Sequence, residues 1–206
     1  MALVRSKKNG GDTETTAAAR GLEELTADLW NTSSGVRRAA ARDLATLPGS
    51  AVALCDRLEV EPSPSVRSAI MTGLILANTQ EVASRLADHL HSDDAQLRNA
   101  AIEALQEMPD AVAPLLRQLL ADEDSDVRIF AVNILAVLRH EQAPEQLAQV
   151  IRTDPHINVC SAALDGLVEV GATEMISDIE LLGARFPESD FVRFAVDTAI
   201  RRIRGT

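Results

Sequence analysis

The chain has few aromatic residues and almost no lysine. Such shortages limit the folds and the functions that the sequence is compatible with. Aromatic residues make up 2% of 206 residues, tyrosine is absent, and the only lysines are Lys7 and Lys8. A core must therefore be built from Leu, Ile, Val and Ala. Such a core favours closely packed helices over a β-sandwich or barrel, whose strands prefer β-branched and aromatic residues. Five aromatic side chains also make a poor stacking platform for single-stranded nucleic acid.

The chain also lacks net positive charge. Its formal net charge is −11 and its pI is about 4.8. Proteins that bind nucleic acid are usually basic, because contacts with phosphates supply most of their affinity. This acidic protein is therefore not expected to bind nucleic acid.

Cysteine and long apolar runs are scarce as well. Cys55 and Cys160 each fall in an apolar helical pattern, which favours two small buried thiols over a disulfide. No stretch approaches the roughly 18 apolar residues of a membrane span. The N-terminal residues 1–11 have no hydrophobic segment after their charges, unlike a secretory signal. We expect a cytoplasmic protein without a membrane span.

What the chain does contain is a repeated pattern, clearest at residues 122–138. Val127, Ala131, Leu135 and Leu138 follow one another at helical spacing and form one apolar stripe. Asp124 stands three residues before Val127, where a side chain that caps the start of a helix is expected.

The same pattern recurs along the chain at intervals of 30 to 33 residues. Its first apolar residue, here called the anchor, is Val36, Val66, Leu97, Val127, Val159 and Val192 in successive copies. The eighth residue after each anchor is Leu44, Leu74, Leu105, Leu135, Leu167 and Ile200. The third residue before it is Ser33, Ser63, Asp94, Asp124, His156 and Ser189, mostly good helix caps. Gly73 and Gly166 precede the leucine column and indicate close packing. This period is typical of a solenoid.

A second helix is expected between successive anchor helices. The expected segments are 51–58, 81–91, 111–120, 143–151 and 174–184. One helical hairpin cannot bury its apolar faces alone, so neighbouring hairpins must stack. The sequence predicts an all-α fold, an α-solenoid of about five to six hairpins in residues 21–206. Residues 1–20 show no periodicity and are expected to form a flexible tail, with a basic docking segment as the alternative.

The chain resembles the HEAT-repeat family, in particular the short bacterial repeats of phycobilin-lyase-like proteins. The resemblance is carried by anchor–arginine pairs that end in Arg37, Arg67, Arg98, Arg128 and Arg193, while Cys160 replaces the arginine in the fifth repeat. It implies that each arginine pairs with an acidic side chain at the end of the preceding helix. Glu61 would then pair with Arg67, and Asp122 with Arg128. A row of phosphate-binding arginines is the less favoured interpretation.

Residues typical of catalysis or metal binding are not spaced for it. The chain has no Gly-x-Ser-x-Gly, phosphate-binding loop or Gly-x-Gly-x-x-Gly sequence. His89, His91, His140 and His156 form no His-x-x-x-His pair, and the acidic loops lack the spacing of a calcium-binding loop. We predict no enzyme activity, catalytic residue, metal site or cofactor.

The candidate site is therefore a surface. The family resemblance implies that the anchor helices line a concave face, with the second and sixth residues after each anchor pointing outward. The predicted partner-binding residues are Arg38, Arg42, Thr72, Asn99, Glu103, Ile129, Phe130, Asn133 and Asp165. Phe130 stands in a column that otherwise holds only alanine, so it either fills a void or anchors a partner.

These observations favour a non-catalytic scaffold or adaptor for protein–protein interaction, with its protein partner on the concave face. The alternative is a phycobilin-lyase-like chromophore-handling protein or assembly chaperone, which the resemblance alone suggests. A nucleic-acid-handling protein is disfavoured, because Arg37, Arg38 and Arg42 make only a small basic patch. The oligomeric state stays open.

Overall fold

The computed structural model describes residues 21–138, 141–170 and 173–205. Every regular element in these ranges is helical, which confirms the predicted all-α class. The predicted tail at residues 1–20 lies outside the described part of the chain, so the proposed domain boundary stays a prediction.

The helices run in pairs along the chain. The first helices of the pairs are α1 (Leu22–Asp28), α3 (Ala51–Leu58), α5 (Gln80–Asp88), α7 (Pro109–Leu119), α9 (Ala143–Thr153) and α11 (Ile176–Arg185). The second helices are α2 (Ser34–Leu44), α4 (Pro64–Ala77), α6 (Ala95–Gln106), α8 (Ser125–Val137), α10 (Ile157–Val170) and α12 (Asp190–Arg204). Short 3₁₀ turns follow α5 at His89–His91 and precede α11 at Thr173–Met175.

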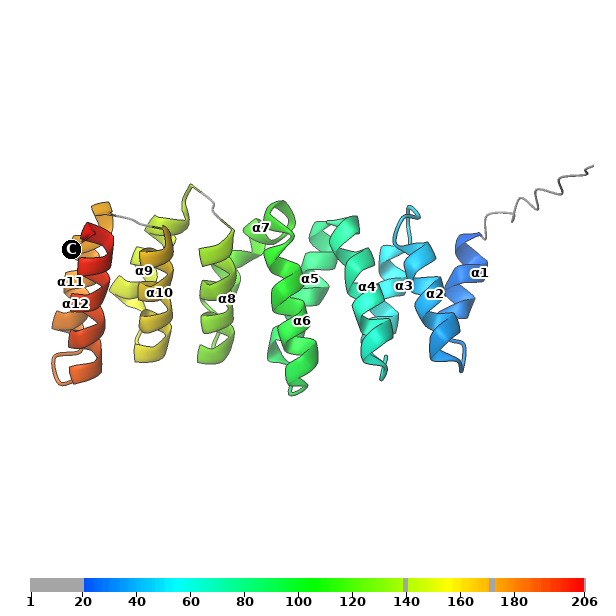
Figure 1. Ribbon diagram of the computed structural model, residues 1–206, viewed down its shortest axis with the longest axis horizontal. Coiled ribbons are helices and arrows are strands. Elements are labelled where there is room, and N and C mark those ends of the chain that lie inside the picture. The colour runs from blue at the N-terminus through cyan, green and yellow to red at the C-terminus, as the bar shows by residue number, and fades with distance from the viewer. Residues whose placement is uncertain (1–20, 139–140, 171–172, 206) are drawn as a thin grey trace, which may run out of the picture.

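The pairs stack side by side into an elongated array with α1 and α12 at its two ends (Figure 1). Each even-numbered helix packs on the next even-numbered helix, from α2 to α12, and these helices form one layer. The odd-numbered helices form the second layer behind them in the view of Figure 1. This arrangement confirms the predicted solenoid.

The predicted columns face the core between the two layers. All anchors except Val36 are buried, and Val36 is half-buried in the first repeat. The leucine column is fully buried from Leu44 to Leu167. Both cysteines are free and buried, as predicted. The burial pattern therefore confirms the repeat register.

The glycines at Gly73 and Gly166 allow close approach between repeats. A Cβ atom on Gly73 would lie 2.9 Å from Leu54 Cδ1 and 3.2 Å from Ala45 Cα. A Cβ atom on Gly166 would lie 3.1 Å from Ala136 Cβ. Both glycines face the preceding repeat and also the first helix of their own hairpin, which confirms their predicted role in packing.

The arginine column closes the loops within each hairpin. The guanidinium groups of Arg37, Arg67, Arg98, Arg128 and Arg193 each donate to the carbonyl oxygen six residues earlier, at 2.6 to 2.9 Å. Because the acceptor is a backbone atom, the side chain at that position can vary. This explains why Ser92 and Pro187 are tolerated where an acid was expected.

The acidic partners of Arg67 and Arg128 differ from the prediction. Arg67 donates to the backbone oxygen of Glu61, whereas the Glu61 carboxylate accepts from Arg37 of the preceding repeat at 2.8 Å. Likewise Arg128 pairs with Asp154 at 2.7 Å. The predicted pairs Glu61–Arg67 and Asp122–Arg128 are therefore wrong at the level of the side chains. The ion pairs join consecutive repeats.

We call this series of arginine contacts between repeats the arginine ladder. At two positions its contacts differ from the pattern. Arg98 lies over the Phe130 ring, 5.6 Å from its centroid, while Asp122 of the next repeat meets His91. Where Cys160 replaces the arginine, Arg185 of α11 donates to the Asp154 carbonyl at 2.6 Å. The loop of the fifth repeat is therefore also bonded to a guanidinium group, but the arginine comes from α11 and not from the arginine column.

Candidate functional site

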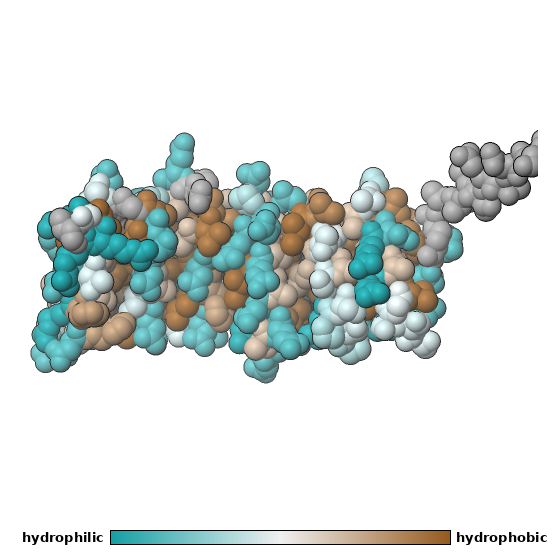
Figure 2. Space-filling model, in the orientation of Figure 1, coloured by the Kyte–Doolittle hydropathy of each residue, from teal (hydrophilic) through white to brown (hydrophobic). Residues whose placement is uncertain are grey.

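The predicted partner-binding residues all lie on the layer of even-numbered helices. Seven of them are exposed: Arg38, Arg42, Thr72, Asn99, Glu103, Asn133 and Asp165. They lie on α2, α4, α6, α8 and α10, so one face of the array carries them all. We call this surface the even-helix face. On it, hydrophilic side chains alternate with hydrophobic strips between helices (Figure 2).

Ile129 and Phe130 differ from the other seven. Both are half-buried and pack against the core. Ile129 was expected to point outward and does so only in part. The Phe130 ring fills the space beneath Arg98, which is the first of its two interpretations. A role for either side chain in binding stays a prediction.

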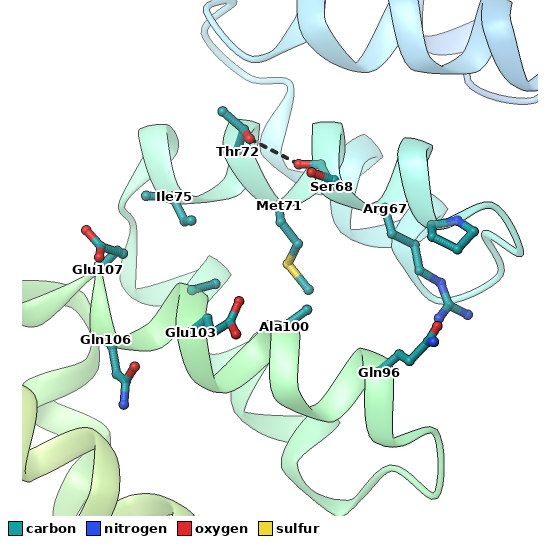
Figure 3. A pocket seen from close by; sticks show the side chains of 12 residues that line it. Arg67, Ser68, Met71, Thr72, Ile75, Gln96, Ala100, Glu103, Gln106 and Glu107 are labelled. Carbon is teal, nitrogen blue, oxygen red and sulfur yellow. Dashed lines mark hydrogen bonds between the residues drawn. The ribbon is translucent and has the colours of Figure 1, made fainter.

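A hollow of the even-helix face lies between α4 and α6. It has a volume of about 580 Å³. Met71 of α4 points into the space between the helices, opposite Ala100 and Glu103 of α6 (Figure 3). Arg67 and Gln96 lie at one end of this hollow. We call it the α4–α6 groove.

The α4–α6 groove combines an apolar floor with a polar rim. Met71 and Ala104 are buried, and Ile75 is half-buried at the far end of the floor. The rim is polar and exposed, with Thr72 on the α4 side and Glu103 on the α6 side. An apolar floor with a few polar groups is the usual construction of a binding site.

A second hollow adjoins this groove on the α2 side. It has a volume of about 310 Å³ and lies between α2 and α4, where Arg42 and Leu76 line it. Leu76 is 62% exposed, which is unusual for a leucine. Ser68 and Thr72 line both hollows, so they form a low ridge of small side chains between them. Thr72 Oγ1 donates to the Ser68 carbonyl at 3.0 Å, as the dashed line in Figure 3 marks.

Sequence reasoning missed most of the floor. Only Thr72, Glu103 and Arg42 of the predicted residues line the two hollows. Met71, Ile75 and Leu76 were not singled out. Leu76 could have been noticed, since it stands ten residues after its anchor in a column that faces outward.

An exposed aromatic pair lies farther along the even-helix face. Phe191 and Phe194 of α12 are 64% and 68% exposed. They are three residues apart and therefore share one side of the helix. Neither was among the predicted site residues, although Phe194 occupies the outward column.

No helix of the described segments is long and apolar enough to cross a membrane. In residues 21–138, 141–170 and 173–205, no cluster of three or more His, Cys, Asp or Glu side chains is placed to hold a metal ion.

Stacked helical hairpins of about 30 residues with an arginine ladder define an α-solenoid. A family model of HEAT repeats matches residues 19–106, 51–128 and 112–201. The chain therefore belongs to the HEAT-repeat family. No curated protein matches it.

Two solved structures illustrate the range of similar chains. An engineered protein from the Northeast Structural Genomics Consortium is 20% identical, with a TM-score of 0.43, over 89% of this chain and 96% of that one. The complex of CpcE and CpcF of phycocyanin lyase from Nostoc sp. PCC7120 is 16% identical, with a TM-score of 0.39, over 98% of this chain and 100% of the other. Likenesses this distant carry no argument about function.

Proposed function

We propose that this chain is a non-catalytic scaffold or adaptor that binds a protein partner on the even-helix face. The observation that supports it is the pair of adjoining hollows across α2, α4 and α6. They offer an apolar floor, a polar rim and an exposed leucine in one continuous region. Interfaces gain most of their affinity where a partner's side chains fill such apolar pockets.

The shape of the hollows favours a protein segment over a small molecule. Both hollows are partly open to solvent, whereas sites for small molecules bury most of the ligand surface. The chromophore-handling alternative depends on the resemblance of repeat type alone and stays a prediction.

The test blocks the hollows without touching the core. Ser68 and Thr72 are exposed, so Ser68→Arg/Thr72→Arg fills both hollows from the ridge between them. Affinity capture from the native host, read by mass spectrometry, should lose the partner with this variant while the circular dichroism spectrum is unchanged. A photo-crosslinking residue at position 72 should also link to the captured partner.

The matched control places the same charges on the opposite layer. Ser84 of α5 and Gln118 of α7 are exposed, and Ser84→Arg/Gln118→Arg should retain the partner. A partner that survives the ridge substitutions and crosslinks from position 84 would contradict binding on the even-helix face.

A further inference from the structure

We propose that the occupant of the two hollows is an extended peptide segment whose charge is polarised, with acidic residues at its α2 end and basic residues at its α6 end. This inference depends on the proposed function and specifies the chemistry of the partner at the same site. The observations behind it are the two hollows, the low ridge between them and four charges on α2 and α6 that form no ion pair within the described part of the chain.

Three exposed charges, Arg42, Glu103 and Glu107, line the hollows, and Arg38 is exposed one turn before Arg42 on α2. Arg38 and Arg42 on α2 form no ion pair with the described residues, and neither do Glu103 and Glu107 on α6. By contrast, Arg67 within the groove pairs with Asp94 at 2.7 Å. No other residue in the described ranges neutralises these four charges, so they are available to a ligand.

These charges are separated by sign along the array. The positive pair lies on α2, the negative pair lies on α6, and α4 between them presents Ser68, Thr72 and Leu76. A partner that crosses α4 therefore meets a positive field on one side and a negative field on the other. Complementary charges fix the register and orientation of such a partner more than they add affinity.

The spacing of the hollows sets the spacing of the apolar side chains. Packed helices lie about 8–10 Å apart, so neighbouring hollows are separated by about the same distance. A chain in the extended polyproline II conformation advances about 3.1 Å per residue with three residues per turn, so side chains three positions apart lie on the same side and about 9 Å apart. The small side chains of Ser68 and Thr72 let a backbone cross the ridge. The fitting segment carries two apolar residues at positions i and i+3 between its charged ends.

The probe is a synthetic fluorescent peptide with two glutamates, a central Leu-x-x-Leu and two lysines. It is made in acid-first and base-first order, because the hollows do not fix the direction of the chain. A third peptide has the same composition with one glutamate and one lysine at each end. A fourth replaces both leucines with serine.

Binding is measured by fluorescence anisotropy at low and at physiological salt. At least one polarised peptide should bind about threefold or more tightly than the mixed-charge peptide, since each exposed charge pair contributes only modestly and two pairs form at each end. Arg42→Glu and Glu103→Lys should each weaken it by a similar factor. The fourfold variant Arg38→Glu/Arg42→Glu/Glu103→Lys/Glu107→Lys inverts the sign at both ends, and it should restore binding with the opposite order preferred where order matters.

Two control variants carry the same charge changes elsewhere. Arg117→Glu on α7 and Glu123→Lys in the loop before α8 alter exposed residues away from both hollows, and should leave binding unchanged. Equal binding of the polarised and mixed-charge peptides, or equal effects of site and control reversals, would overturn the polarity. Undiminished binding of the serine peptide would show that the two leucines of the peptide do not occupy the hollows.

Failure here is distinguishable from failure of the proposed function. Should the ridge substitutions abolish partner capture while the charge reversals leave both capture and peptide binding unchanged, the site stands and the polarised occupant is wrong. Should the ridge substitutions leave capture intact, the site itself is wrong.

Discussion

Glu61 is the most heavily bonded carboxylate of the ladder that joins the repeats. It is fully buried and accepts hydrogen bonds from Arg37, Arg57 and the Ser63 backbone N–H. Burial alone raises the pKa of Glu61. The bonds from Arg37, Ser63 and Arg57 outweigh burial and lower the pKa from 4.5 to about 2.

This pKa makes stability depend on pH in a predictable direction. The folded-state pKa lies below the unfolded-state value of 4.5, so the ionised Glu61 stabilises the fold in full above that pH. The stabilisation is lost as the pH falls from 4.5 toward about 2. Glu61→Gln should lower the free energy of unfolding at neutral pH by about 3 kcal/mol, because it leaves buried guanidinium groups without a counter-charge. It should also flatten the acid limb of stability against pH in urea melts.

The matched control is Glu169→Gln, at the exposed pair with Arg202. That pair is 2.8 Å long but about two-thirds exposed, and such pairs contribute roughly 0–1 kcal/mol. A loss for Glu169→Gln as large as that for Glu61→Gln would contradict the importance assigned to the buried ladder.

At the scale of the element, two glycines in helices have opposite surroundings. Gly73 of α4 faces Leu54 and Ala45 so closely that an added Cβ would lie 2.9 Å from the Leu54 side chain. Gly183 of α11 has no atom within 4 Å of an added Cβ. Helix propensity favours alanine at both positions, so packing decides the difference between them.

Alanine should therefore have opposite effects at these positions. Gly73→Ala should destabilise by about 1–2 kcal/mol, since it overpacks the contacts of α4 with Leu54 of α3 and with Ala45 after α2. Gly183→Ala should stabilise by about 0.5–1 kcal/mol through helix propensity alone. Urea melts of the two variants check the sign; stabilisation by both would mean that α4 and its neighbours can separate at little cost.

At the scale of the whole molecule, the array makes stability depend on position. In a solenoid each repeat contacts only its neighbours, so a central repeat is held on two sides and a terminal one on one side. Leu135 in the fourth repeat and Leu44 in the first are both fully buried and occupy the same column.

The same substitution should thus cost more in the centre. Leu135→Ala should lower the free energy of unfolding by about 2–5 kcal/mol, and Leu44→Ala by less, because the first repeat has fewer neighbours. Urea melts followed by circular dichroism measure both. Equal or reversed losses would argue against stacking as the source of stability.

The sequence by itself determined the class, the period and the register. Anchor and leucine columns recur at every repeat, and a 30-residue amphipathic hairpin can bury its faces only by stacking. A stacked array with these columns facing the core is therefore the arrangement that the pattern predicts. The same periodicity placed Arg42, Thr72 and Glu103 on the outward side of their helices. Burial confirms this local geometry because it depends on helical spacing alone.

Only the tertiary structure decided which residues meet across repeats. It paired Arg37 with Glu61 and Arg128 with Asp154, brought Arg185 to the place left by Cys160, and packed Phe130 under Arg98. It also decided that the two hollows open between α2, α4 and α6. Met71 lies in the floor of one hollow, and Leu76 is an exposed residue that lines the other. The periodic pattern specifies the face of each helix. The distance and rotation between neighbouring helices depend on the fit of particular side chains, and sequence spacing does not contain that information.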